Sequence, residues 1–338
     1  MARHTTKSKK KQSPSRILDT IYAFRPARVL LTSFELGIFT AIGDGPKESR
    51  EIAQTLGTSE RATDRLMNAL CGMGFLKKRG GRFQNTPLTA RYLVKDRPDY
   101  LAGLMHQVGL WERWSTLSQA VREGSPVTVH GEIGDQGSGW LEAFIEAMHM
   151  RARGQAGIVA RSINLRGVKR VLDVGGGSGA FSMAFVRTKK GLQAVVFDLP
   201  QVTILTRRFL EAEGLTNSIE TTDGNYETDS LGSGFDLVFL SAIIHSNSAE
   251  VNRLLFKKAY DALTPEGRLV VLDHVMREDR TTPLAGAFFS LNMLVGTKAG
   301  DTYTESEIRQ WMTEAGFKDI RRKSTPFGTD LMIGKKKT

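Results

Sequence analysis

The fold of this chain is decided by the stretch Lys169-Arg170-Val171-Leu172-Asp173-Val174-Gly175-Gly176-Gly177-Ser178-Gly179-Ala180-Phe181. A short β-branched run ends in an acid, glycines follow at alternate positions, and an apolar helical pattern begins at Phe181. This order predicts a strand–loop–helix unit of a doubly wound α/β sheet. Because glycines let the backbone approach a ligand that side chains would hold away, the loop predicts a nucleotide-cofactor site.

The spacing of the glycines helps to choose the cofactor. Gly175, Gly177 and Gly179 differ from the dinucleotide fingerprint, whose last glycine lies one residue further on, and this argues against NAD. Asp173 has the wrong sign to face a pyrophosphate, but it suits an ammonium or sulfonium group. The loop therefore favours S-adenosylmethionine, and a tight turn without a ligand is the alternative.

Length and composition set the broad class. The chain has 338 residues, 40% of them hydrophobic, which is enough for two globular domains. Its single cysteine, Cys71, excludes an internal disulfide framework and predicts a reducing, cytoplasmic compartment. No apolar run approaches the roughly 20 residues of a membrane span, and no apolar segment follows the basic start. We therefore expect no membrane partner and no signal peptide.

The net charge of +11 is concentrated at the two ends of the chain. Six uncompensated positive residues lie in residues 1–16, and Lys335, Lys336 and Lys337 lie near the other end. We expect residues 1–16 to form a disordered basic tail on a nearly neutral folded body. This distribution argues against nucleic acid as a partner.

The region after the tail predicts a small helical domain. Apolar residues from Ile17 to Ile42 follow helical spacing that is interrupted at Arg25-Pro26, which predicts two helices. Residues 49–70 give a helix-turn-helix, and residues 75–78 and 81–85 give two strands closed by a tight turn, so together they predict a winged helix. A DNA-binding regulator is one alternative, but acids interrupt the basic face of its second helix; a packing unit with a dimer interface is the favoured interpretation.

The remainder alternates between strands and helices, which predicts a largely parallel sheet. Two amphipathic helices, Asp99–Ser125 and Trp140–Ile163, precede it and flank the glycine-rich loop Gly131–Gly139. A turn over residues 264–267 closes a helix at Ala249–Ala262, and Thr304 with Glu307 forms a capping box for a helix over residues 304–315. The expected strands are 170–174, 194–197, 218–222, 235–241, 268–273, 320–323 and 331–334.

Ligands of such sheets lie over the carboxyl ends of the strands, so the residues that end each strand are the candidate site. Asp198, about twenty residues past the glycines, is placed to accept hydrogen bonds from ribose hydroxyls. Gly224, Asn225 and Tyr226, after the third strand, offer an amide and an aromatic face for an adenine ring. These residues support a nucleoside without identifying the group that is transferred.

A histidine and an acid end the next two strands. His245 follows the fourth strand and is the candidate general base that removes a proton from a hydroxyl. Asp273 ends the fifth strand and is the candidate that holds His245 in the useful tautomer. A purely structural histidine is the alternative.

Taken together, these motifs resemble the S-adenosylmethionine-dependent O-methyltransferases of the plant caffeate and acetylserotonin type, in their bacterial small-molecule branch. The resemblance covers nearly the whole chain from about Ile17. It rests on the glycine loop at residues 171–179 together with the segments 196–200, 224–226, 240–245, 263–269 and 311–317.

The resemblance implies a fold and a domain organisation. The fold is α/β, with a C-terminal class I (Rossmann-like) methyltransferase domain and a mainly α N-terminal winged-helix dimerisation domain. Residues 17–98 would form that dimerisation domain, residues 99–165 the helices that line the substrate pocket, and residues 166–338 the S-adenosylmethionine-binding domain. The partners implied are a second copy of the chain and a small-molecule acceptor.

The resemblance also implies roles for individual residues. His245 and Asp273 match the general base and an acid that orients it, and Met148 would flank the cofactor or the substrate. The acceptor pocket would include Phe144, Met148, Phe289, Asn292 and Met293. The cofactor set comprises Asp173, Gly175, Gly177, Gly179, Asp198, Leu199, Gly224, Asn225, Tyr226, Ser241 and Met148.

Some positions depart from the family pattern. Asn225 replaces an acid, and the family's His-Asp-Trp is His245-Ser246-Asn247 here. A second orienting acid is displaced by one residue to Asp301, which leaves open whether Asp273 or Asp301 supports the base. Isolated acids at these positions predict no metal site.

The sequence therefore predicts an O-methyltransferase that acts on a hydroxyl of a flat aromatic or polycyclic small molecule. A cofactor-binding homologue that does not methylate, and a DNA-binding regulator with a ligand-sensing domain, are the two alternatives.

Overall fold

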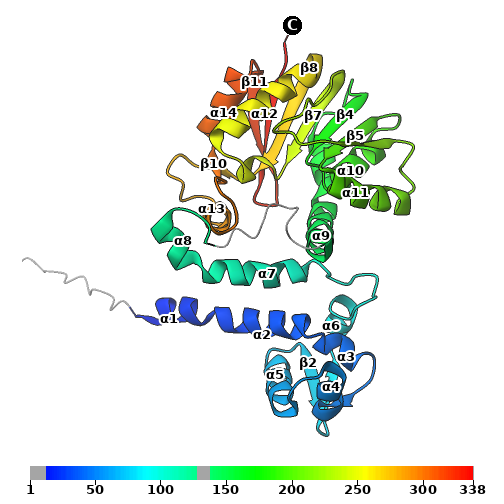
Figure 1. Cartoon of the computed structure of the whole chain (residues 1–338), viewed down its shortest axis with the longest axis vertical. Helices are drawn as coiled ribbons and strands as arrows, with labels where there is room; N and C mark the ends of the chain where they lie inside the picture. Colours follow the sequence, from blue (N-terminus) through cyan, green and yellow to red (C-terminus); the bar gives the residue numbers. More distant parts are fainter. Residues whose placement is uncertain (1–12, 128–137, 338) are drawn as a thin grey trace, which may run out of the picture. The chain divides into compact units, whose positions relative to one another are not determined.

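The computed structural model describes residues 13–127 and 138–337, and its backbone divides after Val108 into two units (Figure 1). Of the predicted basic tail, residues 1–12 lie outside the described residues, whereas the first helix already begins at Ser15. The predicted loop 131–139 also lies mostly outside them. Within the described segments, no helix is both long and apolar enough to cross a membrane.

The first unit is a helical domain with a small three-stranded sheet in the order β1-β3-β2. Its buried core includes Phe34, Ile38, Ile52, Met67 and Phe83. The elements are α1 (Ser15–Tyr22), α2 (Phe24–Glu35), α3 (Ile38–Ile42), β1 (Lys47–Glu48), α4 (Ser49–Leu56), α5 (Glu60–Gly72), β2 (Leu76–Arg79), β3 (Arg82–Asn85) and α6 (Pro87–Tyr92).

The predicted helix pair and hairpin of this unit are confirmed, and the start of the chain differs from the prediction. Gly57, with φ of +64°, ends α4 and turns the chain into α5, while β2 and β3 pair antiparallel. The two helices expected at Arg25-Pro26 are α1 and α2, and the break between them lies at Ala23, three residues before Pro26. Pro26 lies in the first turn of α2, where its missing N–H is not needed. The second break comes at Gly37, whose left-handed backbone separates α2 from α3.

The second unit is built on a seven-stranded sheet in the order β11-β12-β8-β7-β4-β5-β6, in which β12 runs antiparallel to β8 and β11. The division between the units falls within α7 (Leu104–Ser115). The elements that follow are α8 (Leu117–Glu123), α9 (Ser138–Ser162), β4 (Arg170–Val174), α10 (Ala180–Thr188), β5 (Gln193–Asp198), α11 (Pro200–Ala212), β6 (Ile219–Asp223), β7 (Phe235–Ser241), η1 (Ile244–Ser246), α12 (Ala249–Ala262), β8 (Leu263–Asp273), β9 (Val275–Met276), α13 (Leu284–Gly296), β10 (Tyr303–Thr304), α14 (Glu305–Glu314), β11 (Lys318–Ser324) and β12 (Asp330–Lys335).

The chain order creates a switch point beside the central strand. From β4 the chain steps to β5 and β6 on one side, and then returns to β7 on the other side of β4. The connection after β4 runs to one side of the sheet and the connection to β7 runs to the other side. Such a reversal opens a crevice at the carboxyl ends of these strands. The predicted parallel sheet is thus confirmed, and it places the ends of β4, β5, β7 and β8 along one rim.

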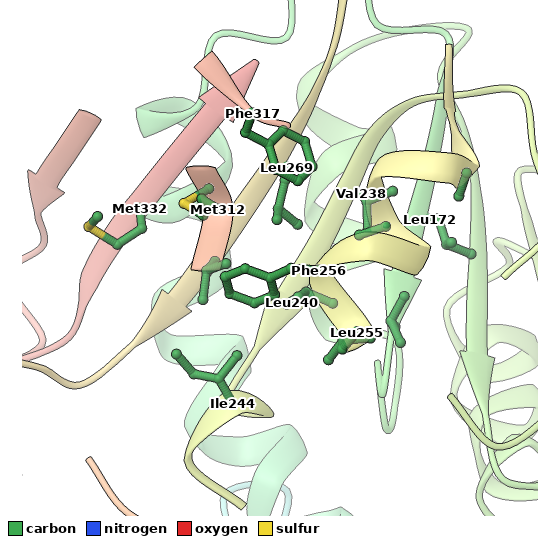
Figure 2. Packing of buried hydrophobic residues seen from close by; sticks show 14 of the residues in the cluster. Leu172, Val238, Leu240, Ile244, Leu255, Phe256, Leu269, Met312, Phe317 and Met332 are labelled. Atoms are coloured by element: carbon green, nitrogen blue, oxygen red, sulfur yellow. The ribbon is translucent and has the colours of Figure 1, made fainter. Parts of the chain in front are cut away.

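Helices cover both faces of this sheet, and the central strands alternate between them. Val238 and Leu240 pack with Phe256 on one face, where Figure 2 shows them together, while Leu237 and Phe239 belong to the core on the other face. Because successive residues of a strand point to opposite faces, a strand buried on both sides is apolar throughout. This explains the continuous run of apolar residues in β7.

Two predicted elements of this unit differ from the structure. The single helix expected over residues 99–125 is two helices, α7 and α8, separated at Thr116, whose hydroxyl donates to the Arg113 carbonyl (2.7 Å). The turn expected at residues 264–267 lies inside β8, where Glu266 has φ of +66° and the register with β7 shifts. The predicted capping box is confirmed, since the Thr304 N–H donates to the Glu307 carboxylate at 2.8 Å.

The core above β7 and β8 supports a stability prediction. Phe256 is fully buried and meets Trp311 edge-on, at 6.2 Å between ring centres. We expect Phe256→Ala to lower the free energy of unfolding by about 3–5 kcal/mol, because the cavity cannot close completely. Leu254, on the same helix, is 45% exposed, and Leu254→Ala should change it by about 0.5 kcal/mol or less. Urea unfolding of both variants tests this expectation, and equal midpoints would contradict it.

Candidate active site

The glycine loop leaves the end of β4 with left-handed backbone at Gly175, Gly177 and Gly179. The Gly175 N–H donates to the Phe197 carbonyl at the end of β5 (2.8 Å). A Cβ added to Gly175 would lie 2.2 Å from Cδ1 of Ile243. Only glycine fits there, so the loop backbone passes without side chains between β5 and the segment that follows β7.

Asp198, at the end of β5, holds the glycine loop in place through its carboxylate. One of its carboxylate oxygens accepts the Gly177 N–H (2.9 Å), and the other accepts the Leu199 N–H (2.8 Å). Burial raises the pKa of Asp198, and these two hydrogen bonds oppose that effect. Because each oxygen has two lone pairs, the carboxylate can accept further hydrogen bonds from a ligand.

Asp173 lies beneath the loop. Its side chain is 1% exposed and accepts a hydrogen bond from the Ser182 hydroxyl (2.7 Å). A Cβ at Gly176 would come within 2.8 Å of its carboxyl carbon. Burial, reinforced by the negative charge of Asp198, raises the pKa of Asp173 to about 7. The charge of this group therefore changes near neutral pH.

The loop after β6 carries the three residues predicted near an adenine. The Gly224 N–H donates to the Asp198 carbonyl (2.9 Å), and the Asn225 side chain accepts the Glu227 N–H (2.9 Å). The Tyr226 hydroxyl donates to Asn247 (2.8 Å), and burial raises the pKa of Tyr226 to about 12. The loop thus begins at the end of β6, bonds to the end of β5 and is anchored to the segment after β7.

His245 and Asp273 come together from neighbouring strands. The His245 imidazole lies in η1, directly after β7, and its Nδ1 is 2.8 and 3.0 Å from the two oxygens of Asp273 at the end of β8. Both side chains are buried. Burial acts to raise the pKa of Asp273, but the imidazole and the His274 N–H outweigh it and lower that pKa. An ionised Asp273 requires the proton on Nδ1 of the ring, which leaves Nε2 as a base.

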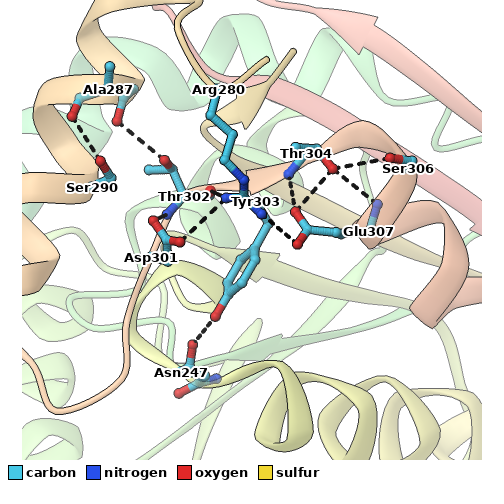
Figure 3. Close-up of polar contacts among 11 residues, drawn as sticks. Asn247, Arg280, Ala287, Ser290, Asp301, Thr302, Tyr303, Thr304, Ser306 and Glu307 are labelled. Atoms are coloured by element: carbon cyan, nitrogen blue, oxygen red, sulfur yellow. Dashed lines mark hydrogen bonds and ion pairs between the residues drawn. The ribbon is translucent and has the colours of Figure 1, made fainter. Parts of the chain in front are cut away.

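The structure also shows which of the two candidate acids, Asp273 or Asp301, contacts His245. The Asp301 carboxylate pairs with Arg280 (3.4 Å) and accepts the Thr302 N–H (2.7 Å), as Figure 3 shows. Only its backbone N–H reaches His245, by donating to the carbonyl of that residue (2.9 Å). Asp273 therefore contacts the imidazole, and Asp301 supports the backbone.

The predicted acceptor-lining residues divide between two helices. On α13, the Phe289 ring meets His245 edge-on with ring centres 4.7 Å apart, and Asn292 accepts a hydrogen bond from the Trp114 indole (3.0 Å). Met293 on the same helix is buried. On α9, Phe144 stacks on Trp140, with ring centres 5.3 Å apart, and Met148 is half-buried. Of this set, Phe289 is the residue placed directly against His245.

Two residues at the site were not predicted from the sequence. His149 on α9 bonds through Nδ1 to the hydroxyl of Ser178 in the glycine loop (2.8 Å) and stacks on Phe209. Asn247, noted in the sequence only as a departure from a family motif, accepts from Tyr226 and donates to Asn252 (3.1 Å). No pattern of spacing marks either residue, because Ser178 and Tyr226, which connect them to the site, lie 29 and 21 residues away.

No cluster of three or more His, Cys, Asp or Glu side chains suited to a metal ion occurs in residues 13–127 or 138–337. The acids at the strand ends are instead engaged one by one with N–H groups, a hydroxyl or an imidazole.

Comparison with known proteins gives the family. Residues 114–318 match the O-methyltransferase domain family, and residues 18–95 match the O-methyltransferase dimerisation domain. The chain is 32% identical over 331 residues to the 3-hydroxy-5-methyl-1-naphthoate 3-O-methyltransferase of Streptomyces sahachiroi, covering 96% of this chain and 95% of that protein. The chain belongs to the O-methyltransferase family.

Two further relatives support this assignment. The tetracenomycin polyketide synthesis 8-O-methyl transferase of Streptomyces glaucescens is 26% identical over 336 residues, covering 96% of this chain and 97% of that protein. The crystal structure of human N-acetylserotonin methyltransferase in complex with S-adenosylmethionine superimposes with a TM-score of 0.83 at 25% identity, covering 99% of this chain and all of that one. The predictions of the α/β fold and of a small-molecule O-methyltransferase that depends on S-adenosylmethionine are confirmed.

The buried Asp173 carboxyl predicts a pH dependence of the stability of this O-methyltransferase without its cofactor. The ordinary carboxyl pKa is 3.8, and in the folded enzyme it is about 7. The unfolded chain therefore loses its proton first, and the stabilisation from this group, complete below pH 4, is lost as the pH rises to about 7. Asp173→Asn cannot ionise, so its stability relative to the wild type should rise over that range.

Urea unfolding at several pH values between about 4 and 8 measures this difference. Asp261→Asn, on an exposed position of α12, is the matched control and should differ from the wild type by a constant amount. A constant difference for Asp173→Asn as well would contradict the prediction.

Proposed function

We propose that this O-methyltransferase methylates a hydroxyl of a flat aromatic or polycyclic acceptor, with His245 as the general base and Asp273 as its positioning residue. The observation that carries the proposal is the buried contact between His245 Nδ1 and the Asp273 carboxylate, at 2.8 and 3.0 Å.

This contact supports a specific proton transfer. The carboxylate holds the Nδ1 proton, so Nε2 presents its lone pair. As the acceptor oxygen bonds to the methyl carbon, its O–H bond breaks and the proton passes to Nε2. The resulting imidazolium is stabilised by the ionised Asp273. When bound, S-adenosylmethionine supplies a methyl group on a sulfonium, which leaves as a neutral thioether.

The residues around the glycine loop fit that cofactor. In our proposal, the loop backbone at Gly175, Gly177 and Gly179 lies along its amino-acid part. All three glycines have left-handed backbone, and a Cβ at Gly175 would lie 2.2 Å from Cδ1 of Ile243. Asp198 binds the ribose through the lone pairs that its two N–H contacts leave over.

The remaining cofactor contacts are proposed from the same rim. Gly224, Asn225 and Tyr226 flank the adenine, and Leu199, Ser241 and Met148 complete the walls. Asp173 acts from beneath the loop, where a cation above it would favour its ionised form.

The acceptor class is supported by the side chains and by the relatives. Phe289, Asn292 and Met293 on α13, with Phe144 and Met148 on α9, offer aromatic and thioether surface together with one amide, which suits a flat ring system. Both Streptomyces relatives carry the names of aromatic or polyketide O-methyltransferases. We therefore propose an acceptor with fused or substituted aromatic rings.

We also propose that the enzyme is a homodimer formed through its first unit. That unit matches a dimerisation domain. On α1, Ile17 is 64% exposed, Ile21 is 55% exposed, and Leu18 is exposed beside them. Because residues spaced by three or four lie on one face of a helix, these side chains form an apolar stripe of the kind that a second subunit covers.

The role of His245 predicts the effect of its removal. His245→Ala should lower turnover about 10²–10⁴-fold, because general-base catalysis contributes that much. The affinity for S-adenosylhomocysteine, measured by calorimetry, should stay near that of the wild type. Transfer of a labelled methyl group to a panel of phenols and naphthols measures the turnover.

Two acids provide the matched comparison. Asp273→Asn should lower turnover by about 10²-fold or more, because the amide can no longer hold the correct tautomer. Asp301→Asn should lower it less than about tenfold, because its carboxylate contacts Arg280 instead of the ring. Unchanged turnover in His245→Ala would remove this residue as the base.

The dimer proposal predicts a change in mass. Light scattering of the wild type should give about twice the chain mass of 37.3 kDa, and Ile17→Asp with Ile21→Asp should shift it toward the monomer, since charges on a covered apolar stripe are costly. Ile204→Asp, on an equally exposed isoleucine of α11, should leave the mass unchanged. A monomeric wild type would be incompatible with the proposal.

A further inference from the structure

His274 carries an unused hydrogen-bonding atom next to the His245–Asp273 pair. The residue is buried, with 7% of its surface exposed. Among the described residues, its Nδ1 is the buried side-chain nitrogen or oxygen that has no hydrogen-bond partner. Burial of a polar atom without a partner costs about 1–3 kcal/mol, and such atoms are rare in folded proteins. This position therefore calls for a functional explanation.

The surroundings of His274 connect it with the reaction. It follows Asp273 at the carboxyl end of β8, and its backbone N–H donates to the Asp273 carboxylate (2.7 Å). Its ring lies against Phe289 with ring centres 4.6 Å apart, and the same phenyl ring meets His245 at 4.7 Å. The two histidine rings therefore cannot be further apart than the sum of these two distances, which a fused aromatic ring system can span.

The protonation state of His274 decides whether its Nδ1 can accept a hydrogen bond. Burial lowers the pKa of His274, and the nearby charge of Arg151 on α9 acts in the same direction, against the opposing effect of Asp273. The ring also makes a hydrogen bond with the backbone of Gly328, in the turn between β11 and β12. A neutral ring that donates from Nε2 leaves Nδ1 as a pure acceptor.

We propose that Nδ1 of His274 accepts a hydrogen bond from a second hydroxyl on the acceptor, so that the enzyme selects aromatic acceptors with two hydroxyls on one ring system. This inference rests on the proposed methylation of a hydroxyl beside His245. A site built to bond a substrate hydroxyl discriminates strongly against the analogue that lacks it, because its own buried polar atom is then left unpaired. His274 is in this way a specificity-determining residue, while His245 removes the proton.

The test compares acceptors with one and with two hydroxyls. The probes are 1-naphthol and 2-naphthol against a set of dihydroxynaphthalene isomers, used with the full-length enzyme. His274→Phe keeps a ring of similar size against Phe289 and cannot accept a hydrogen bond. His274→Gln keeps an acceptor oxygen and serves as the conservative variant. Thermal unfolding and affinity for S-adenosylhomocysteine confirm that each variant is folded.

The expected result is a change of selectivity. In the wild type, kcat/KM for the preferred dihydroxynaphthalene should exceed that for the naphthols about tenfold or more. His274→Phe should remove most of this preference by raising the KM for the dihydroxynaphthalene, while turnover of the naphthols stays near the wild-type value. His274→Gln should restore part of the preference. Calorimetry of the same probes in the presence of S-adenosylhomocysteine should show the same ratio of Kd values, independently of turnover.

Other outcomes overturn the inference. If His274→Phe lowers kcat/KM equally for all acceptors, or leaves the ratio of kcat/KM values unchanged, His274 has a structural role only. Methyl transfer by the wild type would then still support the proposed function. A wild type that binds S-adenosylhomocysteine but methylates none of the probes and binds mono- and dihydroxy probes equally would refute both proposals.

Discussion

The contact of Ile243 with the bare backbone of Gly175 is the constraint on which the rest of the site depends. Gly175 has φ of +63°, and a Cβ there would lie 2.2 Å from Cδ1 of Ile243, so glycine lets the segment after β7 pack closely over the end of β4. That segment leads directly into η1 and His245. The same glycine therefore keeps the loop free of side chains and lies beside the segment that carries His245, the proposed base.

Three carboxylates lie at the carboxyl ends of β4, β5 and β8, and their different partners give them different properties. Asp273 faces an imidazole, which lowers its pKa, whereas Asp198 accepts two backbone N–H groups. Asp173 accepts hydrogen bonds from the hydroxyl and the backbone of Ser182, but burial outweighs them and raises its pKa to about 7. The same edge of the sheet thus holds an acid with a lowered pKa beside His245 and, beneath the glycine loop, an acid with a raised pKa.

The sequence predicted most strands and the capping box at Thr304 because these features depend on residues close together in the chain. It missed the breaks at Gly37 and Thr116, since the apolar spacing continues across both of them. It also placed Asp273 and Asp301 on equal terms. A one-residue displacement in a motif cannot show which carboxylate turns toward the imidazole, and Arg280, which holds Asp301 away, lies 21 residues earlier.

By itself, the sequence determined the class of fold and the identity of the histidine and acid that follow successive strands, because the alternation of strands and helices is a local pattern. The glycine loop together with the family resemblance indicated the methyl donor. Only the tertiary structure decided the pairing of His245 with Asp273, the anchoring of Tyr226 by Asn247, and the unpartnered Nδ1 of His274. These features depend on side chains that are far apart in sequence. Their geometry depends on how the strands and helices pack, which no local pattern encodes.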